Sequence, residues 1–376
     1  MGNKRNRSRL QEGGNMEKKL RVAILGATGM VGQRFITLLE NHPWFEVAAV
    51  AASPRSSGIR YLDAVSERWK MAVPVPEKVR DMMVLDIHDI EQIKSEVDFV
   101  FCALNMPKDK IVELEEMYAK AEIPVVSNNS ANRETQDVPM VVPEINPEHI
   151  EIIERQKKRL GTKHGFIAVK PNCSIQSYTP ALFAWKDFEP KEVMVSTYQA
   201  ISGSGRTFRE WPEMEENLIP FINGEEEKSE KEPLRILGEY QNGEIVPKTE
   251  MKISAQCLRV SVLNGHTATC AVRFGKKPTK EELIKALEEF ESEPVKLGLP
   301  SAPNPFMRYM EDETDLNVKK DVNFQHGMGV SFARLREDSI FDFKFIGLSH
   351  NTIRGAAGGA ILLAELLYKK GYINSF

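Results

Sequence analysis

Three glycines at regular spacing constrain the fold of this 376-residue chain more than any other feature. Gly26, Gly29 and Gly32 directly follow an apolar strand, Leu20–Leu25, and precede a helical apolar pattern. Glycines in such a turn let backbone amides approach a pyrophosphate, and the helix dipole favours its charge. The turn therefore predicts a Rossmann-type dinucleotide-binding unit near the N-terminus, and a tight turn without a ligand is the alternative.

The end of the second predicted strand, Phe45–Ala52, indicates which dinucleotide binds. Sites for NAD usually place an acidic side chain at this point to bind the ribose hydroxyls. No acidic residue lies between the end of this strand and Asp63. Ser53 and Ser56 offer hydrogen-bond donors there, and Arg55 offers donors and a positive charge. These groups suit the 2′-phosphate of NADP, so we expect NADP as the cofactor, with a polar surface loop as the alternative.

The pattern of apolar residues changes near residue 166. Strands alternate with helices before it, which predicts a parallel sheet with helices on both faces. After it, residues 193–199, 252–262 and 267–274 alternate as half-exposed strands do, which predicts a mainly antiparallel sheet. The expected fold class is α/β, divided into a disordered tail (1–15), an NADP-binding Rossmann domain (16–165), an α+β catalytic and oligomerisation domain (166–349) and a C-terminal helix that returns to the first domain (350–376).

Asn264-Gly265 lies between the last two of these strands and is a strong signal for a two-residue hairpin turn. Such a turn would place Leu263 opposite His266 and put Arg259 on the same face, because side chains alternate along a strand. The Cα atoms of Arg259 and His266 would then lie roughly 13–14 Å apart, a gap that a small substrate could fill.

Composition and charge exclude several classes of function. The net charge of −4 gives no electrostatic reason to expect binding to nucleic acid or to an anionic membrane. No apolar run approaches the ~20 residues of a membrane span. The cysteines show neither metal-ligand nor disulfide spacing, so we expect no metal, and reduced thiols in the cytoplasm; they are Cys102, Cys173, Cys257 and Cys270.

Cys173 stands where a buried strand, residues 166–169, turns into an amphipathic segment after Pro171-Asn172. A thiol at a helix N-terminus feels the positive end of the dipole, which favours the nucleophilic thiolate. We therefore expect a nucleophile at Cys173, with a small buried hydrophobe as the alternative. Pro180 would kink or delay a helix that starts here, and a later start would weaken the dipole argument.

Residues 171–174 (Pro-Asn-Cys-Ser), 199–205 and 351–359 occur together with Arg259 and His266 after a dinucleotide fold. This combination resembles the aspartate-semialdehyde dehydrogenases, in the branch typical of archaea and fungi, from about residue 16 to the C-terminus. The resemblance implies a fold like that of glyceraldehyde-3-phosphate dehydrogenase. It also implies NADPH-dependent reductive dephosphorylation of L-aspartyl 4-phosphate to L-aspartate 4-semialdehyde through a cysteine thioester, in the biosynthesis of lysine (through diaminopimelate), threonine, methionine and isoleucine.

The same resemblance implies a role for each residue of the catalytic group. Cys173 would be the nucleophile and His266 the general acid/base, because a histidine can exchange protons near neutral pH. Gln199 would orient the acyl intermediate. Arg259 would bind the substrate α-carboxylate through its fork of donors, and Arg133 would bind phosphate.

Further site residues are implied in the same way. Asn172 belongs to the expected substrate site. Glu232 and Arg235 match a glutamate and a basic residue three apart that face the substrate amine and phosphate, and at helical spacing they share a face. The expected cofactor contacts are Gly26, Thr28, Gly29, Met30, Val31, Ser53, Arg55, Ser56, Ser202, Gly203, Asn351 and Thr352.

Other functions remain as alternatives. Malonyl-CoA reductase shares the fold and the thioester chemistry but lacks asparagine before its cysteine, so Asn172 favours the semialdehyde enzyme. N-acetyl-glutamyl-phosphate reductase is a more distant relative. A non-catalytic NADP-binding regulator is disfavoured because the whole catalytic group is present. The resemblance implies substrate and phosphate as partners, no nucleic acid or membrane, and a homodimer or homotetramer.

Overall fold

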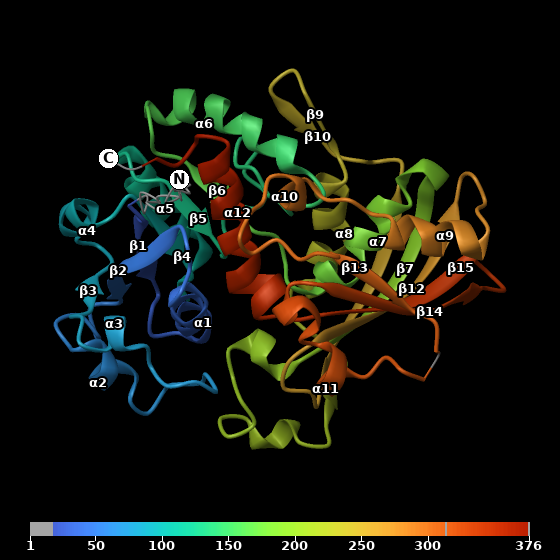
Figure 1. The fold of residues 1–376 in the computed structure, drawn as a ribbon, viewed down its shortest axis with the longest axis horizontal. Helices are drawn as coiled ribbons and strands as arrows, with labels where there is room; N and C mark the ends of the chain where they lie inside the picture. Colours follow the sequence, from blue (N-terminus) through green and yellow to red (C-terminus); the bar gives the residue numbers. More distant parts are fainter. Residues whose placement is uncertain (1–17, 313, 375–376) are drawn as a thin grey trace, which may run out of the picture.

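The computed structural model describes residues 18–312 and 314–374, and the predicted disordered tail, residues 1–15, lies outside them. Two large sheets lie side by side, the first built from the N-terminal part of the chain and the second from later residues (Figure 1). Apolar residues from both sheets belong to one buried cluster, so the two halves share part of their core. None of the helices in the described part of the chain is long and apolar enough to cross a membrane.

The first sheet has six strands, and all of its strand pairs are parallel, as the sequence predicts. In sheet order they are β3 (Leu85–Asp86), β2 (Phe45–Ala52), β1 (Leu20–Leu25), β4 (Phe99–Cys102), β5 (Val125–Ser127) and β6 (Ile167–Val169). Because β1 lies between β2 and β4, the glycine turn after β1 stands near the middle of the carboxyl edge, where open parallel sheets bind ligands.

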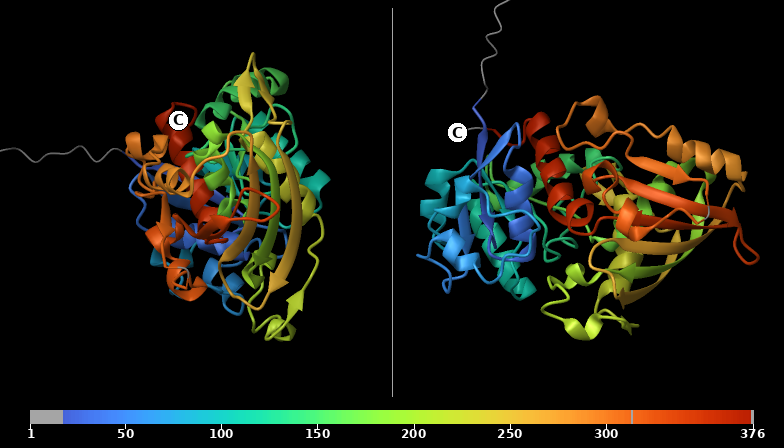
Figure 2. Two further views of the ribbon diagram at one scale, coloured as in Figure 1. Left: turned by 90° about the vertical axis from the view of Figure 1, so that its right-hand side faces the viewer. Right: turned by 60° about the horizontal axis from the view of Figure 1, so that its bottom comes forward.

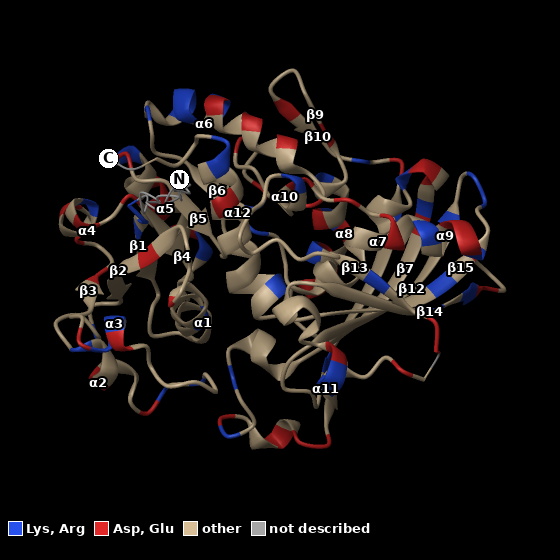
Figure 3. Cartoon of the chain, in the orientation of Figure 1, with Lys and Arg blue, Asp and Glu red and all other residues tan. Residues whose placement is uncertain are grey.

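Helices cover both faces of the parallel sheet. They are α1 (Met30–Leu39), α2 (Tyr61–Val65), α3 (Glu77–Arg80), α4 (Ile90–Glu96), α5 (Lys108–Lys120), the 3₁₀ turn η1 (Pro147–Ile152), α6 (Ile153–Leu160) and the C-terminal α12 (Gly358–Lys369). Phe35 of α1 and Leu366 of α12 share one core with Phe101 of β4, whereas Leu114 of α5 packs with Cys102 on the opposite face. Charged residues mark the outer helix α6, whereas much of α12 is uncharged (Figure 3), as its place in the core requires.

The second sheet has seven strands with mainly antiparallel pairs, which confirms the predicted fold class. In sheet order they are β13 (Met307–Met310), β14 (Val330–Glu337), β15 (Phe343–Ser349), β12 (His266–Phe274), β7 (Pro190–Gln199), β11 (Lys252–Val260) and β8 (Leu218–Ile219), and a separate ribbon pairs β9 (Glu239–Gln241) with β10 (Glu244–Val246). Alternating residues of β7, such as Val193 and Val195, are buried, while Met194 between them is 52% exposed.

Helices cover the buried face of this sheet, while the other face stays open (Figure 2). The helical elements are η2 (Ser174–Ser177), α7 (Thr179–Ala184), η3 (Lys186–Phe188), η4 (Ile201–Ser204), η5 (Pro212–Met214), α8 (Glu225–Ile236), α9 (Lys280–Glu288), α10 (Glu293–Lys296), α11 (Val318–Asp321), η6 (Phe324–Gly327) and the π-helical turn η7 (Ile353–Ala357). Trp185 and Leu283 share the core beneath the sheet with Val195.

The predicted hairpin between β11 and β12 is wrong. β7 lies between these two strands, pairing with β11 in parallel and with β12 in antiparallel register. His266 therefore pairs with Ser349 of β15, and Arg259 pairs with Gln199 of β7. The Asn-Gly signal fails because a turn sequence describes only local backbone, whereas strand order depends on which distant strand fills the gap.

The strand that leads to Cys173 also differs from expectation. We expected the second domain to begin at residue 166, but β6 (Ile167–Val169) is the edge strand of the parallel sheet and pairs with β5. The parallel sheet therefore extends to residue 169. Consequently the Cys173 segment leaves the same carboxyl edge as the glycine turn.

Candidate active site

A cavity of about 240 Å³ lies where the two halves of the molecule meet. Val31 of α1 contributes to it from the glycine turn, and Cys173 contributes from the segment after β6. Its other walls come from loops and helices of both halves: Asn128, Asn129, Ser130, Arg133, Asn172, Ser202, Gly203, Glu225, Lys228, Asn351, Thr352, Gly355 and Ala356. Most of the predicted cofactor, catalytic and substrate residues therefore lie around one space or next to it.

The loop that carries Cys173 is held by Asn172. Asn172 Oδ1 accepts hydrogen bonds from the backbone N and the hydroxyl of Ser174, both at 2.7 Å. Cys173 then opens the four-residue 3₁₀ turn η2, and α7 begins only at Thr179 with Pro180 in its first turn. The delayed start that Pro180 suggested is therefore present, and no α-helix dipole acts directly on the thiol.

The electrostatic surroundings of Cys173 also differ from the expected thiolate. Burial raises the pKa of the Cys173 thiol, and the nearby Glu225 carboxylate raises it further. Lys170, Arg133 and Arg259 act in the opposite direction but do not reverse the shift. The sulfur in this state is a neutral thiol at neutral pH. Cys173 is nevertheless the accessible one of the four cysteines, because the other three are buried.

His266 lies directly beside the thiol. A distance of 3.3 Å separates Cys173 Sγ from His266 Nε2. The backbone N–H of Ala200 donates to His266 Nδ1 at 3.0 Å, so the neutral imidazole carries its proton on Nε2 and directs it at the sulfur. Burial lowers the pKa of His266 to about 3, with the Arg259 guanidinium as the second cause, so the ring is neutral at physiological pH.

Arg259 and Gln199 reach the same place by strand pairing. They are partners across β11 and β7, at the end of β7 from which the chain continues to Ala200. Arg259 Nη1 donates to the Ala200 carbonyl at 2.7 Å, and Gln199 Nε2 donates to Glu225 Oε2 at 3.2 Å. A Cβ added at Gly203 would lie 2.8 Å from Arg259 Nη1 and 3.2 Å from His266 Nε2. Gly203 thus lets the backbone approach both side chains.

Arg133 lies at the wall of the cavity, buried among several partners. It donates through Nη1 to Glu232 Oε1 at 3.0 Å and through Nε to the Lys170 carbonyl at 3.1 Å. A third bond joins Nη2 to the Asn128 carbonyl at 3.3 Å. Since an arginine has five N–H donors, two remain for a ligand.

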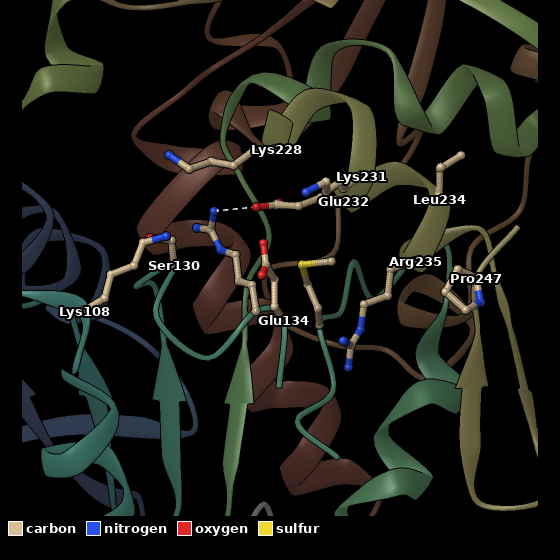
Figure 4. Close-up of a pocket in the computed structure, with 11 residues that line it drawn as sticks. Lys108, Ser130, Glu134, Lys228, Lys231, Glu232, Leu234, Arg235 and Pro247 are labelled. Atoms are coloured by element: carbon tan, nitrogen blue, oxygen red, sulfur yellow. Dashed lines mark hydrogen bonds and ion pairs between the residues drawn. The ribbon is translucent and has the colours of Figure 1, made fainter. Parts of the chain in front are cut away.

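The predicted pair on α8, Glu232 and Arg235, does not act as a unit. Glu232 bonds Arg133 and accepts from the backbone N of Asn172 at 2.6 Å, so it supports the cysteine loop. Arg235 instead donates to three backbone carbonyls of residues 135–138. Figure 4 shows Arg235 pointing away from Glu232, which is the ion-pair partner of Arg133. The structure therefore does not bring Arg235 to the cysteine.

Glu225 and Lys228 form the ion pair of α8 that does reach the cavity, and the sequence analysis did not identify them. Lys228 Nζ lies 2.7 Å from Glu225 Oε1, and both residues line the cavity. Glu225 also accepts from Asn172 Nδ2 at 2.9 and 3.1 Å. The signal was available, because this pair has the same spacing of three as Glu232 and Arg235 and begins the same charged run. Spacing alone does not identify which turn of a helix faces the site.

Lys170 is a second residue that the sequence did not indicate. Its ammonium group is buried and donates to the carbonyl oxygens of Pro171 and Gly355. Burial lowers the pKa of Lys170 to about 7. Lys170 therefore ties the cysteine loop to the η7 turn, where a Cβ on Gly355 would lie only 2.8 Å from Cys173 Cβ.

The glycine turn has the geometry that a pyrophosphate requires. Gly26 has φ +89°, and a Cβ there would lie 2.4 Å from the Ala103 carbonyl oxygen. A Cβ at Gly32 would lie 2.2 Å from the Gly26 oxygen, whereas Gly29 meets nothing closer than 3.5 Å. No side chain caps the N-terminus of α1, so its first amides, beginning at Met30, have no side-chain acceptor there and are available to a ligand.

Other predicted cofactor residues belong to the glycine turn or line the cavity. Thr28 accepts a hydrogen bond at its carbonyl from Gln33 Nε2 at 3.0 Å, which fixes the turn. Asn351 Nδ2 donates to Ser202 Oγ at 2.8 Å, and its Oδ1 accepts from Gly265 N at 2.9 Å. Asn351 and Ser202 line the cavity together with Gly203 and Thr352.

The segment after β2 lies beside the glycine turn. Gly26 N donates to the Ala51 carbonyl at 2.9 Å, so the end of β2 and the turn are directly joined. Ser53 and Arg55 are exposed there, whereas Ser56 is 5% exposed. Ser53 and Arg55 are therefore available to a 2′-phosphate, and Ser56 is the least accessible of the three predicted residues.

A parallel dinucleotide fold beside a cysteine–histidine pair defines the class of protein, a dinucleotide-dependent dehydrogenase with a cysteine in its active site. Two family models match the chain: the semialdehyde dehydrogenase NAD-binding domain over residues 21–153 and the semialdehyde dehydrogenase dimerisation domain over residues 182–354.

Individual relatives are similar over nearly the whole chain. The aspartate-semialdehyde dehydrogenase of Aspergillus fumigatus is 40% identical, covering 94% of this chain and 99% of the relative. That of Methanothermobacter thermautotrophicus is 42% identical, covering 92% and 98%. A crystal structure of aspartate semialdehyde dehydrogenase with NADP from Candida albicans has a TM-score of 0.85 at 39% identity, covering 95% of this chain and all of that one. The chain belongs to the aspartate-semialdehyde dehydrogenase family, which confirms the predicted resemblance to archaeal and fungal members.

Proposed function

We propose that this protein catalyses the NADPH-dependent reductive dephosphorylation of L-aspartyl 4-phosphate to L-aspartate 4-semialdehyde, a step in the biosynthesis of lysine, threonine, methionine and isoleucine. One observation carries the proposal. The Cys173 sulfur lies 3.3 Å from the His266 imidazole, in a cavity whose walls come both from the cofactor-binding turn and from the cationic side chains Arg133 and Lys228.

The reaction begins with acyl transfer to Cys173. The sulfur forms a bond to the acyl carbon while the bond from that carbon to the phosphate oxygen breaks. The phosphate leaves with the electron pair and takes up the thiol proton. Arg133, with two unused N–H donors, and Lys228 are the groups that would hold the phosphate.

Reduction and release complete the cycle. NADPH, when bound, supplies a hydride to the thioester carbon. His266 Nε2–H, directed at the sulfur, would stabilise negative charge on that sulfur and on an oxygen bonded to the same carbon. The carbon–sulfur bond then breaks, the aldehyde leaves, and the released thiolate takes up a proton from solvent, which balances the proton lost with phosphate. Arg259 would bind the α-carboxylate, because its guanidinium lies beside His266 with most of its donors unassigned.

The cofactor site fits NADP. The open α1 N-terminus and the glycine turn would hold the pyrophosphate, and Ser53 with Arg55 would hold the 2′-phosphate. Val31, Ser202, Gly203, Asn351 and Thr352 line the path from that turn to the sulfur. The remaining predicted contacts, Thr28 and Met30, belong to the turn itself.

The chain assembles as an oligomer, as its match to the dimerisation domain indicates. We infer a homodimer, or a homotetramer built from such dimers, joined through the open face of the seven-stranded sheet. Met194 is 52% exposed on that face, and Tyr198 and Leu258 are half-exposed beside it. A cytoplasmic location is supported by four free thiols, which suit a reducing compartment.

The reaction is tested in the oxidative direction, by following NADP reduction with aspartate semialdehyde in the presence and absence of phosphate or arsenate. Turnover should require the oxyanion, because phosphate must attack the thioester to release it. Arg133→Ala should raise the KM for phosphate more than the KM for the aldehyde. Oxidation of NADPH by malonyl-CoA without any activity on the semialdehyde would overturn the substrate assignment, while an inactive protein that binds NADP would favour a regulator.

A further inference from the structure

A second cavity lies against the cavity at Cys173, and the two share a wall. It has a volume of about 340 Å³, and Ser130, Arg133 and Lys228 line both spaces. Figure 4 shows the second cavity, with Lys228, Lys231 and Glu232 projecting from α8 and with Lys108 and Ser130 coming from the other side. Arg133, which lines both spaces, forms an ion pair with Glu232, which lines the second.

Among the charged side chains that line the second cavity, cationic ones outnumber acidic ones. Five side chains are Lys or Arg, and only two, Glu134 and Glu232, are acidic. Arg133 and Glu232 pair with each other, so their charges largely offset one another. The other charged lining residues are one glutamate, Glu134, and four cationic residues, Lys108, Lys228, Lys231 and Arg235. Lys108 and Lys231 are exposed at the rim. An anion approaching from solvent therefore meets these two lysines first and then Arg133 with Lys228.

Acyl transfer and hydride transfer at one sulfur require a route for the phosphate that the bound cofactor does not block. Val31, Asn351 and Thr352 line the Cys173 cavity. A cofactor held at the glycine turn would cover this part of the lining. Acyl transfer and hydride transfer use one sulfur in succession, so phosphate has to leave, or arrive, while the cofactor is present. Ser130, Arg133 and Lys228, which form the shared wall, are not among the expected cofactor contacts.

We propose that the second cavity is an anion vestibule, through which phosphate and phosphorylated substrate reach and leave Cys173 in the cofactor-bound enzyme. The inference rests on the proposed function for the identity of the anion. Lys108 and Lys231 are its outer residues and act by raising the local concentration of dianions, since a cleft lined by one sign of charge focuses the field on its ligand. Its apolar residues, including Met140 and Leu234, offer no acceptor that would compete with the anion.

The test compares two reagents that alkylate Cys173, negatively charged iodoacetate and neutral iodoacetamide, on the NADP-saturated enzyme. Both depend equally on the thiolate fraction, so the ratio of their rate constants measures only the steering of charge. In Lys108→Glu/Lys231→Glu the ratio should fall on the order of tenfold. Lys110→Glu is the matched control, because Lys110 lies on the same helix, is exposed and pairs with Glu113. Its ratio should remain that of the wild type.

Two further readouts accompany the labelling. The KM for phosphate should rise several-fold in the double variant while the KM for NADP stays constant, and in the wild type the labelling ratio should fall as ionic strength rises. An unchanged iodoacetamide rate shows that the variant is folded. An unchanged ratio in the double variant, with the wild type still converting aspartate semialdehyde and phosphate, would overturn the vestibule and leave the proposed function intact. A reduced ratio in an enzyme without that activity would keep the anion passage and reject the substrate.

Discussion

The two sides of the Cys173 cavity are built in contrasting ways. The cofactor side is local: strand, glycine turn and helix follow one another within residues 20–39, and Gly26 and Gly32 each have a backbone contact that only glycine permits. The catalytic side is non-local. Cys173 and His266 are 93 residues apart and come from different sheets. The difference teaches that local patterns identify a binding turn, whereas a reacting pair depends on how the sheets are joined.

Removal of the Cys173 sulfur should give the largest difference between the two sides, because it should abolish catalysis and leave cofactor binding intact. Cys173→Ala should lower turnover roughly 10⁴-fold or more, since no other group at the site can form a thioester. Binding of NADP, measured by fluorescence titration, should be unchanged because the glycine turn belongs to another element. In the wild type, iodoacetamide should label Cys173 faster than the three buried cysteines. Residual activity at the wild-type level in the alanine variant would refute the nucleophile.

Much of the fold could be predicted from the sequence because its periodic signals are local. β1 (Leu20–Leu25) and β2 (Phe45–Ala52) have the predicted bounds. Strand order in the second sheet could not be predicted in this way. β7 fills the place between β11 and β12, and nothing within residues 252–274 encodes a partner some 60 residues earlier.

The sequence analysis named many of the residues around Cys173 but not how they are arranged. Arg259 and His266 do come together, but through the end of β7 and Ala200 rather than across a hairpin. Glu225 and Lys228 were missed because two pairs on α8 have equal spacing, and only the docking of the helix selects one. Likewise the predicted thiolate assumed an α-helix at Cys173, where the chain forms a short 3₁₀ turn.

Arg259→Lys tests whether the catalytic side depends on the orientation of the Arg259 guanidinium as well as on its positive charge. A lysine keeps the positive charge but cannot bond Ala200 and grip a carboxylate with a planar fork. We expect kcat/KM for aspartate semialdehyde to fall on the order of 100-fold, about 3 kcal/mol, with an unchanged KM for NADP. Arg273→Lys is the control, because Arg273 lies on β12 of the same sheet, is exposed and pairs with Glu192. Equal kinetics for both variants would place Arg259 outside the substrate site.

The two basic residues of α8 offer a smaller contrast on one helix. Lys228→Ala should raise the KM for phosphate about 30-fold, since Lys228 lines the cavity, and Lys228→Arg should restore most of the loss. Arg235→Ala should leave that KM within about twofold and instead lower the melting temperature, because Arg235 bonds three backbone carbonyls. The reverse pattern would return the substrate role to Arg235.

The smallest effect is expected at the exposed end of the cofactor side. Arg55→Ala should weaken NADPH binding by about 1.5 kcal/mol, or roughly tenfold, the low end for a charge-assisted contact because Arg55 is exposed to water and salt. NADH binding should hardly change, since NADH lacks the 2′-phosphate. Arg60→Ala serves as the control, because Arg60 is also exposed but pairs with Asp63 and Asp81. Calorimetric titration of both cofactors measures the difference directly. Equal losses for NADPH and NADH would show that Arg55 does not read the phosphate, and cofactor choice would then have to come from a contact as non-local as those around Cys173.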